Sequence, residues 1–315
     1  MIKLDLITGF LGAGKTTFIK KYVTYLLQLG ERICIIENDF GAINVDMVIL
    51  KELEKDGVNL EMVVGGDGKE AHKRRLKTKL ISMAMMGYDR VIIEPSGIFD
   101  VDEFFDLLYE EPIDRFYEAS NVIAIVDSKL QTEMSKQARY ILMSEIADAG
   151  AIVFSRTQDT TKEKIEEVVQ FIEAVMNEFK CSGKLDKKTL EYANWENGDT
   201  SWLARIVKSG FNRNAYEKLP LETDDSFQTI FYFDFAMDKE ILLDKINHIF
   251  ADEKCGDVHR IKGFVKASNG ALYEINTTRN EKMTREVNAT EAVLIVIGEN
   301  LDKVQIAEYL GKPTI

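Results

Sequence analysis

A glycine-rich segment near the start of the chain has the residue types and spacing that point most directly to chemistry. Residues 9–16 read Gly-Phe-Leu-Gly-Ala-Gly-Lys-Thr, the Walker pattern of a glycine, four residues and then Gly-Lys-Thr. Glycines let backbone N–H groups converge on phosphates, and a following helix directs the positive end of its dipole at them. The segment therefore predicts a nucleoside triphosphate site made by Gly9, Gly12, Ala13, Gly14, Lys15, Thr16 and Thr17.

Each polar side chain of this segment has an expected role. We expect Lys15 to reach the β- and γ-phosphates, Thr16 to ligate magnesium and Thr17 to support the α-phosphate region. The competing interpretation is a glycine-rich turn that contains a lysine by chance. It is disfavoured because an apolar strand precedes the segment and a helical pattern follows it.

A carboxylate at the end of a second apolar strand complements the glycine-rich segment. Residues 91–93 are Val-Ile-Ile, Glu94 follows them, and Gly97 comes three residues later. P-loop enzymes place an acid at such a strand end to hold the magnesium shell, and a glycine N–H there can sense the γ-phosphate. A strand that ends in glutamate is unremarkable alone, so this prediction depends on the glycine-rich segment.

Short apolar runs alternate with helical stretches through the first two-thirds of the chain and would position these side chains. The runs are rich in β-branched residues, as strands covered on both faces are, and helices are expected at 16–29 and 160–179. The expected strands are residues 2–8, 32–36, 90–94, 121–127 and 151–154. This alternation predicts an α/β fold of the P-loop NTPase kind, with a doubly wound, mostly parallel sheet and ligands at the carboxyl ends of its strands.

The pattern changes after an acidic stretch at residues 221–225, which we interpret as a linker. Beyond it we expect strands at 228–235 and 292–297, helices at 239–250 and 301–310, and a hairpin of 258–267 with 272–277 around Asn269 and Gly270. That order predicts a small α+β domain of the split βαβ type. The chain is therefore divided into a P-loop nucleotide-binding domain, residues 1–220, and a C-terminal α+β domain, residues 226–315.

Charge and cysteine content exclude several classes of protein. The net charge is −13, with 53 acidic against 40 basic residues, which argues against nucleic acid or an anionic membrane as the main partner. Apolar runs fall far short of the ~18 residues that a membrane span needs, and no signal peptide is visible. Cys34, Cys181 and Cys255 are scattered and odd in number, which predicts no disulfide framework and a cytoplasmic location.

Taken together, these motifs resemble those of the CobW-type GTPases, relatives of the urease and hydrogenase nickel-insertion GTPases. Residues 8–17 match the family's form of the phosphate loop, and Glu-Pro-Ser-Gly at 94–97 resembles its second motif. Residues 38–41 with Asp46 resemble its switch segment, and Arg-Ile-Lys-Gly at 260–263 its C-terminal signature. The resemblance spans nearly the whole chain and implies magnesium-dependent hydrolysis of GTP, with ATP as the alternative.

The family's Cys-x-Cys-Cys motif is missing from this chain. Its thiol positions fall on Gly66, Gly68 and Lys69, and Ala42 replaces the family's glutamate after Phe-Gly. Glycine and lysine cannot ligate a soft or borderline metal, so the departure implies that the usual zinc site is lost and that zinc binds weakly.

Glu37, Asp39 and His72 remain near the missing thiols and could hold a hard or weakly bound ion. The favoured interpretation is that the two acids are solvated switch-loop groups. Asp39 would help magnesium and orient the attacking water, and Glu37 is the second candidate for both tasks.

The base-recognition motif also departs from the family's Asn-Lys-x-Asp. Here the expected strand is followed by Ser155, Arg156, Thr157, Gln158 and Asp159. Arg156 can stack flat on a base, as the stem of lysine does. Gln158 is neutral where the family has an aspartate that accepts two guanine N–H bonds, so we expect a weaker preference for guanine unless Asp159 takes over.

Outside these motifs, a basic run at residues 69–79 is most simply a solvated helix face, with docking of an acidic protein client as the alternative. No second metal-ligating residue lies at a typical ligand spacing from His248 or His259, so both are interpreted as structural or surface residues. We expect Trp195 and Trp202 to close the last helical connection of the first domain.

The resemblance implies a slow GTPase that serves as a metallochaperone or activator of a protein client, either a metalloprotein or a corrinoid protein. The alternatives are a nucleotide-gated binding module with negligible turnover, and a nickel-insertase-like GTPase, which ranks lower because no histidine-rich tract is present. A homodimer is left open.

Overall fold

A computed structural model describes residues 1–39, 45–64, 69–95, 101–219, 227–287 and 291–314. The chain divides into two units, Met1–Leu219 and Pro220–Ile315. The acidic stretch interpreted as a linker lies outside the described residues.

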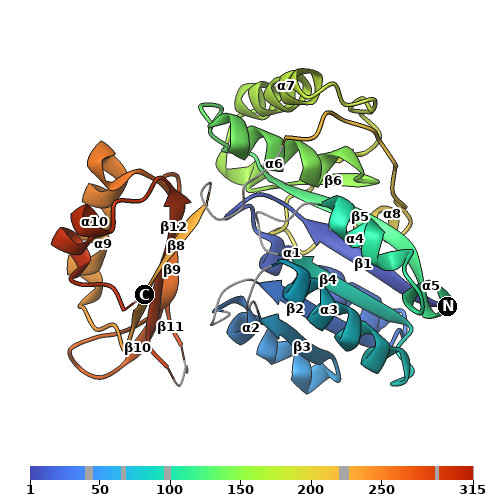
Figure 1. Cartoon of the computed structure of the whole chain (residues 1–315), viewed down its shortest axis with the longest axis horizontal. Coiled ribbons are helices and arrows are strands. Elements are labelled where there is room, and N and C mark those ends of the chain that lie inside the picture. Colours follow the sequence, from blue (N-terminus) through green and yellow to red (C-terminus); the bar gives the residue numbers. More distant parts are fainter. Residues whose placement is uncertain (40–44, 65–68, 96–100, 220–226, 288–290, 315) are drawn as a thin grey trace. The chain divides into compact units, whose positions relative to one another are not determined.

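A seven-stranded sheet with the order β3-β2-β4-β1-β5-β6-β7 forms the centre of the first unit (Figure 1), and every pairing is parallel. Its strands are β1 (Ile2–Thr8), β2 (Ile33–Asp39), β3 (Asn59–Val64), β4 (Arg90–Pro95), β5 (Tyr117–Asp127), β6 (Ala151–Ser155) and β7 (Leu190–Glu191). The predicted doubly wound fold is confirmed. Strands β2, β3 and β4 lie on one side of β1, and β5, β6 and β7 lie on the other. The switch point where such sheets bind ligands therefore lies at the carboxyl end of β1.

Helices connect these strands, as parallel pairing requires. They are α1 (Lys15–Gln28), α2 (Val45–Leu50), α3 (Lys69–Ala84), α4 (Val101–Leu108), α5 (Ile113–Phe116), α6 (Lys136–Ala147), α7 (Lys162–Glu178) and α8 (Leu203–Ile206), with single 3-10 turns at Lys51–Asp56 and Thr157–Asp159. Among the residues that the structure describes, no helix is both long and apolar enough to cross a bilayer.

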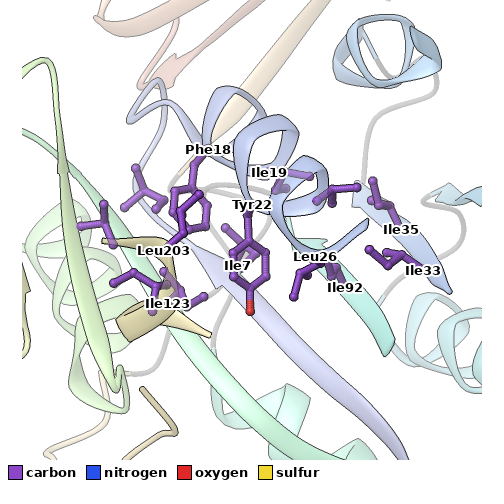
Figure 2. Close-up of a cluster of buried hydrophobic side chains, with 14 of the residues drawn as sticks. Ile7, Phe18, Ile19, Tyr22, Leu26, Ile33, Ile35, Ile92, Ile123 and Leu203 are labelled. Carbon is purple, nitrogen blue, oxygen red and sulfur yellow. The ribbon is translucent and has the colours of Figure 1, made fainter. Parts of the chain in front are cut away.

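Helix α1 fixes the end of the phosphate loop because its apolar face is fully buried on the sheet. Phe18, Ile19, Tyr22 and Leu26 recur at helical spacing and pack with side chains of β1, β2, β4 and β5 (Figure 2). Trp195 and Trp202 belong to the same cluster and lie against Phe18, with ring centroids 5.8 and 6.1 Å from it. Both tryptophans, expected to close the last helical connection, are thus part of the core beside α1.

The second unit is built on a five-stranded antiparallel sheet with the order β11-β10-β9-β12-β8. Its elements are β8 (Gln228–Phe233), α9 (Lys239–Ala251), a 3-10 turn (Glu253–Cys255), β9 (Asp257–Lys266), β10 (Leu272–Thr277), β11 (Lys282–Glu286), β12 (Val293–Glu299) and α10 (Lys303–Leu310). Because β8 and β9 both run antiparallel to β12, they are parallel to each other with β12 inserted between them. The split βαβ prediction is thus confirmed.

Close packing of two strands explains the glycine of the Arg-Ile-Lys-Gly signature. A Cβ on Gly263 of β9 would lie 2.0 Å from the carbonyl oxygen of Val293 on β12. Only glycine permits this close approach of the two strands.

Candidate nucleotide site

The glycine-rich loop between β1 and α1 has a backbone that side-chain-bearing residues rarely adopt. Gly9, Gly12 and Gly14 have φ angles of 144°, 76° and 102°. A Cβ on Gly9 would lie 2.4 Å from the carbonyl oxygen of Ile125. The loop is therefore a glycine-dependent cradle that ends on the N-terminus of a 14-residue helix, an arrangement suited to binding phosphate.

The two polar side chains that open α1 are buried and already engaged. Lys15 Nζ donates a hydrogen bond to the carbonyl oxygen of Gly9 over 2.7 Å. Thr16 Oγ1 donates to Glu94 Oε1 at the end of β4 over 3.1 Å. Thr17 is exposed at the start of the helix. The structure thus joins Thr16 to the acid predicted to hold the magnesium shell.

A second carboxylate lies beside Glu94. Glu37 of β2 is its register partner on the neighbouring parallel strand, and the two residues are 3% and 4% exposed. The interpretation of Glu37 as a solvated switch-loop acid is therefore wrong. Together with the Thr16 hydroxyl they form a set of oxygen donors, the ligand type that magnesium prefers. The donor set therefore fits magnesium. The Asp39 side chain and Gly97, also predicted for this site, lie outside the described residues.

Cys34 of β2 does not replace the missing thiols as a soft-metal ligand. Gly66, Gly68 and Ala42 lie outside the described residues. Cys34 is buried in β2, where burial raises the pKa of its thiol to about 12. A thiol that retains its proton at neutral pH is a poor metal ligand.

Sequence reasoning missed a buried acid behind the phosphate loop. Glu145 of α6 is fully buried, and the Thr8 hydroxyl donates to its backbone carbonyl oxygen over 2.8 Å. Burial raises the pKa of its carboxyl well above the ordinary value of 4.5, while the positive charge of Lys15 and the Gly9 amide act in the opposite direction. The one sequence signal was a glutamate inside an otherwise mostly apolar stretch at residues 140–147.

The loop after β6 contacts the phosphate loop directly. Ser155 Oγ donates to the carbonyl oxygen of Ala13 over 2.7 Å. Arg156 has a φ of 57° and donates from Nη1 to the carbonyl oxygen of Gly12 (3.1 Å) and to Asp127 Oδ2 (2.8 Å). Its guanidinium is held by protein acceptors, so stacking on a base would fall to its methylene stem.

Gln158 and Asp159 lie next to each other on the 3-10 turn that follows, and both are exposed. Gln158 Nε2 donates to Asp159 Oδ2 over 3.4 Å, and that same oxygen lies 4.0 Å from Lys129 Nζ. The Asp159 carboxylate is therefore engaged by two neighbours within the protein.

The basic run on α3 is less solvated than the favoured interpretation supposed. Lys73 and Lys77 both pair with Glu110, at 2.6 and 2.9 Å, and Lys79 pairs with Glu61 at 2.7 Å. His72 is buried. The interpretation as a solvated face is therefore wrong for His72, which is buried. It is incomplete for the three lysines, because their ammonium groups form ion pairs with glutamates of the protein.

These features define a P-loop nucleotide-binding protein. They are a parallel sheet, a glycine loop at its switch point, and the lysine, threonine and acid described above. The family model described as "CobW/HypB/UreG, nucleotide-binding domain" matches residues 4–183. The chain belongs to this family, and the resemblance read from its motifs is confirmed.

Two curated relatives from Escherichia coli (strain K12) match the chain. It is 27% identical over 164 residues to the protein named zinc chaperone YeiR and 28% identical over 163 residues to zinc chaperone YjiA. These matches cover 52% and 50% of this chain and 49% of each relative, so the chain spans about half the length of the curated relatives it matches. A solved zinc-bound triple mutant of the YjiA GTPase aligns over 98% of this chain and 97% of its own, with 17% identity and a TM-score of 0.41.

Proposed function

We propose that this chain is a magnesium-dependent GTPase that acts in the cytoplasm as a metallochaperone or activator of a metal- or corrinoid-dependent client protein. The hydrogen bond from Thr16 to Glu94 carries the proposal, because it joins a helix-opening hydroxyl to a strand-end acid beside the glycine loop. Family membership and the names of the two zinc-chaperone relatives support the metallochaperone part.

The proposed chemistry is the attack of water on the γ-phosphate, with GDP and inorganic phosphate as products. The backbone N–H groups of the loop and the Lys15 ammonium would bind the phosphates, and Thr16 and Glu94 would hold magnesium directly or through water. When bound, magnesium supplies positive charge that stabilises the phosphoryl oxygens. Glu37, adjacent to Glu94, and Asp39 at the end of β2 are the candidates to orient the water.

Nucleotide binding and turnover by three variants test the nucleotide part of the proposal. We expect Lys15→Ala to lose most of its affinity for GTP in calorimetry while its circular dichroism stays unchanged. Lys20→Ala is the matched control, because Lys20 lies on the same helix but pairs with Glu52 at 2.5 Å. If Lys15→Ala binds GTP as tightly as the wild type does, the phosphate site is assigned wrongly.

The third variant, Glu94→Gln, separates hydrolysis from binding. It should bind GTP, hydrolyse it more slowly than the wild type and depend less steeply on magnesium. An unchanged magnesium titration would remove Glu94 from the metal's coordination sphere. Tight GTP binding by a wild type without measurable hydrolysis would instead favour a nucleotide-gated binding module.

A further inference from the structure

Three side chains of metal-ligating type converge in the second unit. Asp257, His259 and Glu299 each offer one ligand atom, and these atoms all lie within 4.8 Å of one another. His259 Nε2 is 2.9 Å from Glu299 Oε1 and 3.7 Å from Asp257 Oδ2. Ligands about 2.1 Å from a tetrahedral zinc ion lie about 3.4 Å apart. The two measured separations lie on either side of that value, so small side-chain movements suffice to bind an ion.

The sheet itself brings these residues together. Asp257 and His259 are two residues apart on β9, and their side chains approach each other, with His259 Nε2 3.7 Å from Asp257 Oδ2. Glu299, the last residue of β12, is the register partner of Asp257, and the pairing shifts register between Ile297 and Gly298 just before it. Without this shift, Glu299 would not be opposite Asp257.

A glycine precedes each of the two carboxylate residues, and neither glycine can be replaced without a clash. A Cβ on Gly298 would lie 2.3 Å from the carbonyl oxygen of Asp257. A Cβ on Gly256 would lie 2.2 Å from the carbonyl oxygen of Asn300. The backbones at the ends of β9 and β12 are thus held in close contact, which fixes the positions from which Asp257 and Glu299 project.

The three candidate metal ligands differ in how far they are buried and in the charged groups beside them. The side chains of Glu299 and His259 are 3% and 15% exposed, whereas that of Asp257 is 44% exposed. Arg279 Nη2 donates to Asp257 Oδ1 over 3.0 Å, which leaves Oδ2 as the oxygen nearer to His259. A hydrogen bond that orients a ligating carboxylate in this way is typical of the outer shell of metal sites. The exposed side of the cluster gives an ion access from solvent.

We propose that Asp257, His259 and Glu299 bind a divalent first-row transition-metal ion of the zinc or cobalt(II) type, with water completing the coordination. The imidazole favours such ions over magnesium and calcium, whose preferred ligands are oxygen atoms. The site contains no thiolate, so its affinity is lower than that of a cysteine site, as suits an ion that is exchanged. This inference goes beyond the proposed function and rests on the second unit alone. It would stand even if the chain hydrolysed no nucleotide.

Titration of the full-length, nucleotide-free protein with Co(II), followed by Zn(II) competition against a chromophoric chelator, tests the proposal. The wild type should bind one ion with visible d–d absorption of a nitrogen- and oxygen-ligated cobalt. Loss of one ligand in His259→Gln, or of one charge in Glu299→Gln, should weaken this binding at least about tenfold. His248→Gln is the matched control, because His248 is an exposed histidine on α9 of the same unit and should leave the titration unchanged.

The same titration distinguishes this site from the oxygen donors of the nucleotide site. Glu94→Gln should retain the cobalt spectrum, because Glu94 belongs to the other unit. Circular dichroism of His259→Gln and Glu299→Gln confirms that each variant is folded. Equal Co(II) affinity in the wild type and in both folded variants would overturn the proposal and leave the cluster as a hydrogen bond between His259 and Glu299.

Discussion

Arg156 donates a hydrogen bond to Asp127 over 2.8 Å, and the same nitrogen also reaches the carbonyl oxygen of Gly12 over 3.1 Å. The contact ties together the ends of β5 and β6 and the phosphate loop. Asp127 Oδ1 meanwhile accepts the backbone N–H of Lys129, so both carboxylate oxygens are used. The residue that follows β6 thus has a structural task at the phosphate loop in addition to any contact with a base.

Asp127→Asn tests whether this contact prepares the site for nucleotide. Asparagine can still accept from the Lys129 amide but loses the charge that holds Arg156. We expect GTP affinity to fall roughly threefold to tenfold, as for one charge-assisted hydrogen bond at a half-buried position, with little change in thermal stability. Asp114→Asn, at an exposed position of α5, is the control. Calorimetry that finds unchanged GTP affinity in Asp127→Asn would show that Arg156 needs no such anchor.

Much of the first unit could be predicted because its central strands are rich in buried apolar residues. The expected strand at 2–8 coincides with β1, and the expected 90–94 and 151–154 end one residue short of β4 and β6. Strands β3 and β7 were missed; they form the two edges of the sheet, where burial is less complete, and β7 has only two residues. Local periodicity reports a strand only where burial dictates the residue type.

Functional residues could be predicted where they belong to one short sequence motif. They could not be predicted where folding brings together residues that are far apart in the sequence. The phosphate loop lies within nine residues (9–17), whereas Glu145 meets it from more than a hundred residues away. His259 was interpreted as structural or surface because no ligand spacing surrounds it. Its neighbour Glu299 is forty residues away in the sequence. A register shift in the strand pairing places Glu299 opposite Asp257, and no sequence pattern predicts that shift.

A buried ionic network at the opposite ends of the strands should dominate the stability of the first unit. Arg90 Nη1 donates to Asp5 Oδ2 over 2.6 Å, and both side chains are almost wholly buried. Tyr22 donates to the same oxygen over 2.7 Å. We expect Arg90→Met to lower the free energy of unfolding by about 3–5 kcal/mol, because it leaves the Asp5 charge buried without a cation.

Urea denaturation followed by circular dichroism measures this effect, and Arg115→Met provides the contrast. Arg115 pairs with Glu111 at 2.8 Å, but both side chains are mostly exposed, so its loss should cost less than about 1 kcal/mol. The double variant Asp5→Asn/Arg90→Met should recover part of the loss. Equal losses in the two arginine variants would show that the Asp5–Arg90 pair contributes no more than a surface ion pair does.

Glu145 should give the first unit a pH-dependent stability. Its folded-state pKa is raised, so the folded chain retains a proton that the unfolded chain releases near pH 4.5. The stabilisation of the protonated form is complete below that pH and is lost as the pH rises towards the folded-state pKa. Compared with Glu145→Gln, which cannot titrate, the wild type should lose up to about 1.4 kcal/mol per pH unit in this window.

Urea unfolding of both proteins at several pH values above 4.5 checks the sign. The difference in unfolding free energy should shift in favour of Glu145→Gln as the pH increases. Glu118→Gln, at an exposed position of β5, should follow the wild type throughout. A constant difference between the wild type and Glu145→Gln would mean that the Glu145 carboxyl titrates normally in the folded protein.

The choice of base depends on which residue of the 3-10 turn reads it. Asp159 is engaged by Gln158 and lies near Lys129, so we predict that Gln158 occupies the position of the family's aspartate. A glutamine amide can present either a donor or an acceptor, whereas an aspartate accepts from both guanine donors and repels the acceptor edge of adenine. The wild type should therefore prefer GTP over ATP by a smaller margin than an Asn-Lys-x-Asp enzyme does. Gln158→Asp should raise the preference by about tenfold if the recovered bond contributes about 1.4 kcal/mol.

Competition binding of GTP and ATP to the wild type, Gln158→Asp and Asp159→Ala separates the alternatives. If Gln158 faces the base, Asp159→Ala should leave the preference nearly unchanged, because it removes only the contacts to Gln158 and Lys129. Abolished preference in Asp159→Ala, together with no gain in Gln158→Asp, would show that the motif is shifted by one residue and that Asp159 reads the base. Equal affinity for both nucleotides in all three proteins would mean that this turn does not select the base, and Arg156 would then act only through its contacts with Gly12 and Asp127.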